Sequence, residues 1–212
     1  MKPTERVNSM RKKIALSGFW FWVSLVLVCL LGVQGYLSYR FPIKQDLYGH
    51  PFRTNQVNRL VAYAFLMRSD RKFARYDADQ INAMIDASAR ESGVDPLLVK
   101  SITLYESYYL STAISTTGAM GLMALMPETV RRQGVRDPFN PAENIAAGAR
   151  QIRMLSDAFQ GDPPLILAGY NAGKSNVQKY HGVPPFPETE AYVSNVMRIY
   201  KYFNEIAYLS KN

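Results

Sequence analysis

The stretch PLLVKSITLYESYYLSTAISTTGAMGLMALMP, from Pro96 to Pro127, decides the fold of this chain. Asp95 and Pro96 supply an N-cap residue followed by a proline at the first helical position, so a helix is predicted to begin there. Only two side chains in the stretch are charged, those of Lys100 and Glu106, and the others are apolar, small or hydroxylated. The stretch therefore predicts a largely apolar helix that carries a single acidic group.

Glu106 lies at helical spacing from Val99 and Ile102, which places its carboxyl group on the apolar stripe of that helix. No basic residue follows it before Arg131, so the local sequence offers no salt-bridge partner. Apolar neighbours and the negative end of the helix dipole both raise the pKa of a carboxyl group, and a carboxyl that stays protonated near neutral pH can act as a general acid. A solvated glutamate at a frayed helix end is the alternative, and the residue chemistry alone leaves both open.

The remainder of the chain from Asp77 is predicted to be helical throughout. Helix patterns end at Gly93, run from the apparent capping box Asn140-Pro141-Ala142-Glu143 to near Gly161, and recur at 165–171 and 188–208. The last helix is predicted to present Tyr192, Val196, Ile199, Phe203 and Ile206 on its inner face. No alternating strand pattern competes, so the sequence predicts an all-α domain over residues 77–208.

Residues 1–35 are predicted to attach the protein to a membrane. Residues 1–13 form a basic tail, and residues 14–33 are an uncharged apolar run long enough to cross a bilayer. The positive charges before the run favour a cytoplasmic N-terminus, so we expect a transmembrane signal anchor at 14–35, with a cleaved signal peptide as the alternative. Residues 36–76 are predicted to be a basic juxtamembrane linker that includes a short helix near 57–67.

Composition excludes several other classes of protein. The net charge is +8, and residues 1–13 alone account for +4 of it through five Lys or Arg and one Glu. The remaining excess is too small to predict nucleic-acid binding. Cys29 is the only cysteine, and the two histidines lie far apart at His50 and His181. We therefore predict no disulfide, no metal site and no cofactor.

Several separated motifs follow one another along the chain. They are Glu106-Ser107, Ser115, Gly118-Ala119-Met120-Gly121-Leu122-Met123, Met126-Pro127 and Gly169-Tyr170-Asn171-Ala172-Gly173. In this order they resemble the soluble-lytic-transglycosylase-like domain of glycoside hydrolase family 23. The resemblance covers roughly residues 78–203, and any one of the motifs alone would be weak. The resemblance sharpens the all-α prediction to a goose-lysozyme-like fold.

The resemblance also implies roles for individual residues. Glu106 is the implied catalytic acid, and the implied substrate-binding residues are Ser115, Met123, Tyr170, Asn171 and Tyr192. From the residues themselves, loop stabilisation is the alternative for Ser115, and a place in the core is the alternative for Met123 and Tyr192. One position departs from the family pattern, because the usual Gly-Leu-Met-Gln ends here in Ala124, whose side chain cannot form a hydrogen bond.

The implied activity is cleavage of peptidoglycan strands between N-acetylmuramic acid and N-acetylglucosamine, with formation of a 1,6-anhydro sugar. A lysozyme-type hydrolase and a non-catalytic peptidoglycan-binding module are the alternatives, the latter because of Ala124. Together with the predicted anchor, the resemblance places the catalytic domain in the bacterial periplasm, held by the inner membrane. The sequence leaves open whether the task is wall turnover or opening the wall for a secretion, pilus or flagellar machine.

Overall fold

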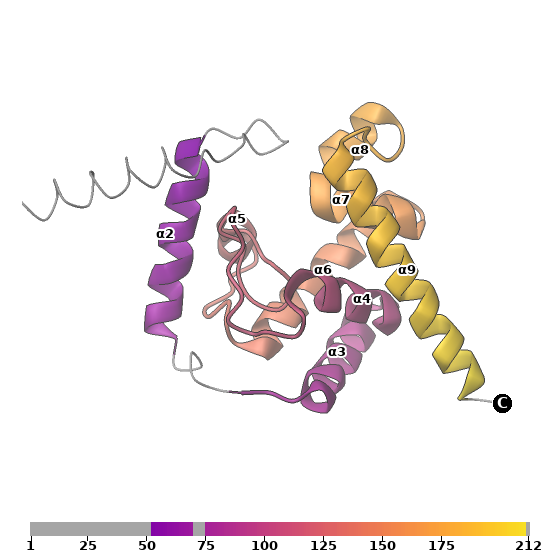
Figure 1. Cartoon of the computed structure of the whole chain (residues 1–212), viewed down its shortest axis with the longest axis horizontal. Helices are drawn as coiled ribbons and strands as arrows, with labels where there is room; N and C mark the ends of the chain where they lie inside the picture. The colour runs from indigo at the N-terminus through magenta and orange to yellow at the C-terminus, as the bar shows by residue number, and fades with distance from the viewer. Residues whose placement is uncertain (1–51, 70–74, 211–212) are drawn as a thin grey trace, which may run out of the picture. The chain divides into compact units, whose positions relative to one another are not determined.

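A computed structural model describes residues 52–69 and 75–210 of the chain, and these residues form helices joined by loops (Figure 1). No strand occurs among them, and the only extended pairing is at isolated bridges around Met120. The predicted all-α class is confirmed. The helices are α2 (Phe52–Arg68), α3 (Ala78–Ser92), α4 (Pro96–Ser107), α5 (Pro127–Arg132), α6 (Pro141–Ala158), α7 (Pro163–Ala172), α8 (Lys174–Tyr180) and α9 (Pro187–Leu209).

The ends of α3 and α4 follow from local chemistry. Asp77 and Gln80 form a reciprocal capping box at the start of α3, which satisfies backbone N–H groups that have no partner within the helix. Gly93 ends α3 in the left-handed conformation at φ 65°, as predicted. The carboxylate of Asp95 then accepts a hydrogen bond from the N–H of Leu97, 2.8 Å away, at the first turn of α4. The predicted start of the central helix is confirmed.

The capping box predicted at the start of α6 is only half formed. Asn140 accepts hydrogen bonds from the N–H groups of Ala142 and Glu143, as a cap should. The Glu143 carboxylate does not return to Asn140. It accepts instead from the N–H groups of Arg136 and Asp137, at 2.9 and 3.4 Å. The prediction was wrong on this point, because the preceding loop presents two backbone donors to the same carboxylate.

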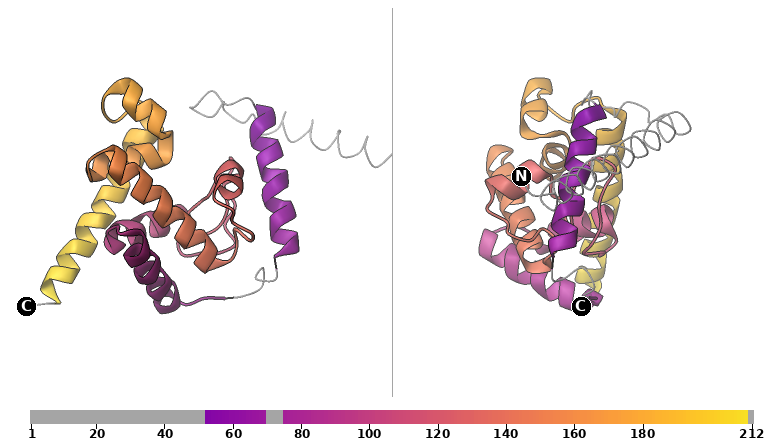
Figure 2. Two further views of the ribbon diagram at one scale, coloured as in Figure 1. Left: turned by 180° about the vertical axis from the view of Figure 1, so that it is seen from behind. Right: turned by 90° about the vertical axis from the view of Figure 1, so that its left-hand side faces the viewer.

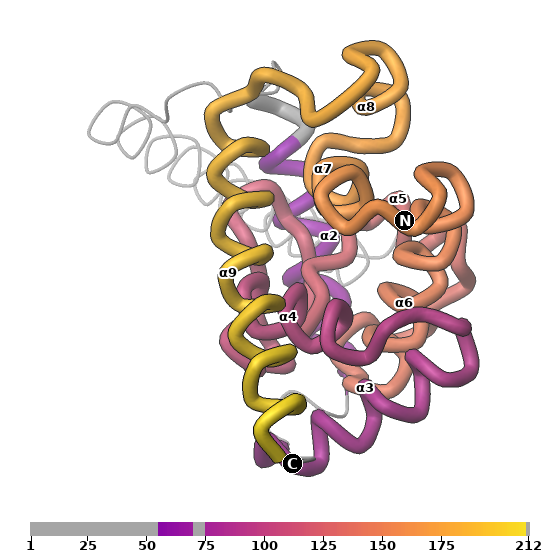
Figure 3. The backbone as a smooth tube through the Cα atoms, turned by 90° about the vertical axis from the view of Figure 1, so that its right-hand side faces the viewer, coloured from indigo at the N-terminus to yellow at the C-terminus, as the bar shows by residue number. Residues whose placement is uncertain are grey.

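Helix α4 lies at the centre of the domain and packs against α3, α6 and α9. The long helix α9 runs beside it, as Figure 3 shows. The first half of α9 carries the buried residues Tyr192 and Val196, but Ile206 near its end is 46% exposed. The predicted inner face of α9 is therefore right for its first half and wrong at Ile206, because the helix extends past the helix it packs on.

Gly148 permits the close approach that its place beside the α6 stripe suggests. A Cβ atom at this position would lie 2.2 Å from the sulfur of Met123. The neighbour is the buried side chain of a loop rather than a second helix. The missing side chain of Gly148 therefore makes room for the loop that follows α4.

Helix α2 lies within the predicted linker and belongs to the same compact unit as the helices that follow it. Its Ala62 is fully buried and joins the hydrophobic core. Gly118, at φ 86°, comes so close to α2 that an added Cβ would lie 2.5 Å from the carbonyl carbon of Asn58. Figure 2 shows α2 from two further sides. The loop after α4 thus meets α2 at backbone distance.

Within the described ranges 52–69 and 75–210, no helix is long and apolar enough to cross a membrane. The basic tail predicted at 1–13 and the anchor predicted at 14–35 lie outside those ranges.

Candidate active site

Glu106 lies in the last turn of α4, one residue before the helix ends. The chain then leaves the helix through Tyr108 and Tyr109, which both have left-handed backbone conformations at φ 50° and 63°. Non-glycine residues adopt this conformation infrequently. Two in succession turn the chain away sharply, so Glu106 stands at the boundary between the buried helix and the loop.

The surroundings of Glu106 raise the pKa of its carboxyl group to about 7. Desolvation by burial is the largest cause, as the apolar stripe predicted. The hydroxyl of Tyr192 donates a hydrogen bond to Oε1 of Glu106 at 2.8 Å, and this bond lowers the pKa because it favours the ionised form. The negative charge of Glu188 raises it again. The result is a carboxyl that can both give and take a proton near neutral pH.

Tyr192 is positioned by its own neighbours. Its ring and the Tyr105 ring pack nearly perpendicular to each other, with the ring centres 5.1 Å apart. Asn195 donates a weak hydrogen bond to the Tyr105 hydroxyl at 3.5 Å. Burial, together with the Glu106 charge, raises the pKa of Tyr192 well above its ordinary value. The phenol therefore stays protonated and acts as a donor to the glutamate. Tyr192 is therefore a buried core residue that also binds Glu106, and its role in substrate binding stays a prediction.

Tyr170, on α7, lies close enough to Glu106 to be affected by its charge. Burial and the charge of Glu106 raise the pKa of its hydroxyl well above the ordinary value. The hydroxyl donates to the carbonyl oxygen of Met123 at 2.7 Å. The Met123 side chain is 0% exposed and packs on Gly148, which is the core-facing alternative considered for it. A role for Met123 in substrate binding stays a prediction.

Ser115 organises its own loop. Its hydroxyl accepts hydrogen bonds from the N–H groups of Thr117 and Ala119, at 3.2 and 2.9 Å, and shares a third with the Thr117 hydroxyl. These bonds correspond to the loop-stabilising alternative. A role for Ser115 in substrate binding stays a prediction, as do those of Tyr170 and Asn171.

Asn171 lies near the C-terminal end of α7. Its side-chain oxygen accepts a hydrogen bond from the hydroxyl of Thr189, 2.9 Å away in the first turn of α9. Thr189 is fully buried. This bond joins the Gly169–Gly173 motif to the helix that carries Tyr192 and Glu188.

Asn144 is a site-supporting residue that the sequence reasoning missed. It is fully buried on α6. Its side-chain oxygen accepts from the N–H of Met123 at 2.8 Å, and its NH₂ group donates to the carbonyl oxygens of Met120 and Pro138 at 2.9 and 2.7 Å. One amide thus holds the Gly118–Met123 loop in place. Its position four residues before Gly148, on a buried stripe, is the signal that could have revealed it.

Gly121 lies over the same amide. An added Cβ would come within 2.3 Å of both the Pro138 carbonyl oxygen and the Asn144 side-chain nitrogen. Ala124 follows in the left-handed region at φ 47° and is half-buried. The loop is therefore built tightly at its glycine and retains a small side chain where the family pattern has glutamine.

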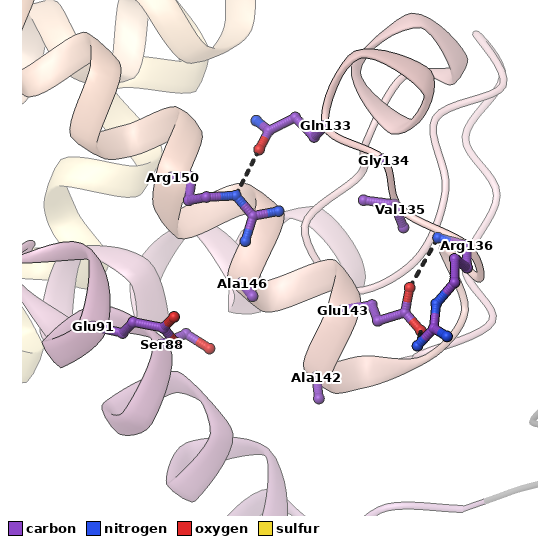
Figure 4. Close-up of a pocket in the computed structure, with 10 residues that line it drawn as sticks. All are labelled: Ser88, Glu91, Gln133, Gly134, Val135, Arg136, Ala142, Glu143, Ala146 and Arg150. Carbon is purple, nitrogen blue, oxygen red and sulfur yellow. Dashed lines mark hydrogen bonds and ion pairs between the residues drawn. The ribbon is translucent and has the colours of Figure 1, made fainter.

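The structure has a separate groove of about 420 Å³ between α3, α6 and the loop that follows α5 (Figure 4). None of the predicted site residues lines it. Glu143 is paired there with Arg136, and Arg150 donates to Gln133. The Glu143 carboxylate also accepts hydrogen bonds from the backbone of the loop before α6.

Comparisons with known proteins show which family this chain matches. The profile of the transglycosylase SLT domain family matches residues 83–193, more than half of the chain. A membrane-bound lytic murein transglycosylase F from Marinobacter nauticus is 30% identical over 153 residues, which cover 69% of this chain and 28% of that protein. The chain thus spans less than a third of that relative's length.

Solved structures point the same way. An inactive Glu-to-Gln mutant of the lytic transglycosylase Slt from Pseudomonas aeruginosa matches with a TM-score of 0.53 and 29% identity, covering 59% of this chain and 24% of that one. The 70 kDa soluble lytic transglycosylase from Escherichia coli matches with a TM-score of 0.51 and 25% identity, covering 57% of this chain and 24% of that one. The chain belongs to the transglycosylase SLT domain family, with a lysozyme-like fold.

Proposed function

We propose that this protein is a peptidoglycan lytic transglycosylase in which Glu106 is the catalytic acid and base. The proposal rests on the raised pKa and the surroundings of that carboxyl group. It is half-buried, its pKa is raised to about 7 chiefly by desolvation, and the hydroxyl of Tyr192 donates a hydrogen bond to it. A paired structural glutamate would have the opposite shift.

In the proposed reaction, protonated Glu106 gives its proton to the glycosidic oxygen between N-acetylmuramic acid and N-acetylglucosamine. The N-acetyl group of the muramic acid stabilises the positive charge that develops at C1. Ionised Glu106 then takes the proton of the same sugar's C6 hydroxyl as that oxygen closes onto C1. The products are a 1,6-anhydro sugar and a free 4-hydroxyl, and no water is consumed. Holding the attacking hydroxyl within the substrate gives it the advantage of proximity over bulk water.

The neighbours of Glu106 fit this scheme. The hydrogen bond from Tyr192 orients the carboxyl and favours the ionised form that the second step needs. We propose that the loop of Ser115 and the side chains of Tyr170 and Asn171 line the sugar-binding surface. Met123, which is 0% exposed, would support this surface from the core. Tyr170 already ties α7 to the Met123 carbonyl.

A lysozyme-type hydrolase is the second candidate, and one observation favours it. Glu188 lies close enough for its charge to raise the pKa of Glu106, so a second carboxylate is available near the site. Hydrolysis needs such a group to activate water or to act as nucleophile. If Glu188 fills that role, Glu188→Gln abolishes cleavage. The transglycosylase proposal expects only a modest loss, because the change lowers the pKa of Glu106 slightly.

We further propose that residues 14–35 anchor the protein in the bacterial inner membrane, with the catalytic domain in the periplasm. The support is the uncharged run behind a basic tail. Full-length protein should then resist extraction by high salt and carbonate, and protease added to spheroplasts should remove the domain. A soluble species that begins near Tyr36 would show a cleaved signal peptide instead.

Incubation of the full-length protein with purified murein tests the activity. The parent should release soluble muropeptides, and Glu106→Gln should release none while it still binds murein. Cleavage near the parent rate by Glu106→Gln would remove this residue from its role. A parent that binds murein without cleaving it would make the protein a binding module.

A further inference from the structure

Helix α2 has two apolar faces. One packs against the hydrophobic core of the described domain, and the other is exposed. The inner face contributes the buried Ala62 to the core, with Phe65 and Leu66 packed against it. Gly118 lets the active-site loop approach the α2 backbone directly. These contacts fix α2 to the domain through the same loop that carries Ser115.

The outer face of α2 is exposed and apolar. Val57, Leu60 and Ala64 lie at i, i+3 and i+7, on one side of the helix, with Tyr63 beside them. Leu60 is 68% exposed, Val57 57% and Tyr63 46%. A contiguous exposed apolar face on a soluble domain marks an interaction surface.

The charges on α2 indicate what this surface meets. The helix contains no acidic residue. Arg68 and Arg59 lie on either side of the apolar face at helical spacing, and Arg68 is exposed. The whole segment 36–76 holds eight Lys or Arg against two Asp. An apolar helix face flanked by basic side chains is the pattern of a helix that lies in the interface of a membrane containing anionic lipids.

The chain length brings this face to a membrane. Sixteen residues, 36–51, separate the end of the proposed anchor from the start of α2. Fully extended, they reach about 55 Å at most. If residues 14–35 span the bilayer, α2 is always within reach of the surface from which the anchor emerges.

We propose that the outer face of α2, formed by Val57, Leu60, Tyr63 and Ala64, lies in the interface of an anionic membrane and fixes the orientation of the catalytic domain above it. This inference rests on the membrane anchoring proposed for residues 14–35. Because α2 is held to the domain by Ala62 and by the Gly118 contact, membrane contact at its outer face determines which way the active-site loop points.

Fluorescence quenching by lipids tests the inference on the full-length chain. Cys29→Ser removes the only native cysteine, and Leu60→Cys then takes a polarity-sensitive fluorophore. The matched control is Met154→Cys, which labels a methionine on α6 that is 44% exposed. Both proteins are placed in vesicles of phosphatidylglycerol and phosphatidylcholine with nitroxide groups on the upper acyl chains. Retained helical content and murein cleavage establish that each variant is folded.

The label at residue 60 should be quenched several-fold more strongly than the label at residue 154, with its emission shifted to shorter wavelength. Val57→Glu in the same protein should reduce both effects. Equal quenching at the two positions in vesicle-bound protein would overturn the inference. So would crosslinking between copies through residue 60 without lipid quenching, which would make the face a self-association surface.

Carbonate extraction of the same vesicles separates this inference from the anchor. Retained protein without quenching at residue 60 contradicts the role of α2 alone. Protein that carbonate releases, but that is quenched at residue 60 beforehand, contradicts the anchor alone. Protein that never associates with the vesicles contradicts both, and murein cleavage reports independently on the catalytic proposal.

Discussion

Two glutamates of this protein lie at opposite ends of helices and in opposite chemical surroundings. Glu143 is in the first turn of α6, where it accepts hydrogen bonds from two backbone N–H groups and pairs with Arg136 at 3.4 Å. Glu106 is half-buried in the last turn of α4, where the phenol of Tyr192 donates a hydrogen bond to it. Desolvation raises the pKa of its carboxyl to about 7. The positive end of a helix and a cation stabilise ionised carboxylates, whereas burial favours the protonated form.

Charged side chains that line a groove do not by themselves identify a catalytic group. In the groove of about 420 Å³, Glu143 pairs with Arg136, and Arg150 donates a hydrogen bond to the neutral side chain of Gln133 (Figure 4). The carboxyl of Glu106 instead has its pKa raised to about 7, so its proton is available near neutral pH. This pKa shift, caused mainly by desolvation, makes Glu106 the candidate general acid.

The largest expected difference is in activity. Glu106→Gln should lower murein cleavage by at least about 10³-fold, because it removes the general acid. Glu143→Gln should retain cleavage near the parent level, since that carboxylate binds Arg136 and the backbone of the loop before α6. Rates of muropeptide release at pH 6.5 to 7, near the pKa of Glu106, compare the two. Equal losses would mean that the contrast between the two carboxyls has no catalytic meaning.

The same pair of variants should differ in the pH dependence of stability. The pKa of Glu106 is about 7 in the folded state, against 4.5 for a solvent-exposed glutamate. Between pH 4.5 and 7 the folded state therefore binds more protons than the unfolded state. Stability of the parent should therefore fall as pH rises from 4.5 to 7, by up to about 3 kcal/mol.

Glutamine at position 106 does not titrate, so this pH-dependent loss of stability is absent from Glu106→Gln. Relative to the parent, the free energy of unfolding of Glu106→Gln should therefore rise with pH, whereas that of Glu143→Gln should not. Urea unfolding in detergent at pH 5 and pH 8 measures it. If Glu106→Gln is equally destabilised at both values, Glu106 is not a buried proton-binding group.

Two tyrosines of α9 offer a smaller contrast. Tyr192 donates to Glu106 at the C-terminal end of α4, while Tyr200 donates to the N-cap Asp95 at its other end. Tyr192→Phe should reduce cleavage about tenfold, the scale of one lost hydrogen bond to a charged group.

Tyr192→Phe should also move the alkaline fall of activity to higher pH, because the lost bond favoured ionised Glu106. Tyr200→Phe should leave the pH profile in place. A profile that Tyr192→Phe leaves unmoved would separate this bond from the proton chemistry.

The smallest effect concerns Ala124. The left-handed conformation at φ 47° is no harder for glutamine than for alanine, so Ala124→Gln should keep the fold. It should tighten murein binding by about 1 kcal/mol, the value of one hydrogen bond. Pull-down of the variant with sacculi measures this. A severe loss of binding would show that the loop at Met123 is arranged differently from the family pattern.

Local signals explain most of what the sequence predicted correctly. The Asp95-Pro96 pair set the start of α4, Gly93 ended α3, and the stripe through Val99 and Ile102 placed Glu106 among apolar groups. Each of these depends on residues within a few positions of one another. That is the range over which periodicity and capping act.

Periodicity and capping could not predict contacts between segments that are distant in the sequence. Asn144 holds the Met120 and Met123 main chain across more than twenty residues, and Tyr170 reaches Met123 across 47. The packing of α2 on Gly118 likewise joins segments with no shared pattern. The capping box at Glu143 failed for a related reason, because a neighbouring loop competed for the carboxylate.

The mass of the murein fragments tests the central claim most directly. If Glu106 alone serves as acid and then base, the fragments released by full-length protein end in 1,6-anhydro-N-acetylmuramic acid. Each is then one water lighter than the hydrolysis product, and no new reducing ends form. Mass spectrometry of a sacculus digest, with Glu106→Gln as the blank, distinguishes the two products. Predominantly reducing termini would contradict the account, and Glu188 would then be the carboxylate to examine for the activation of water.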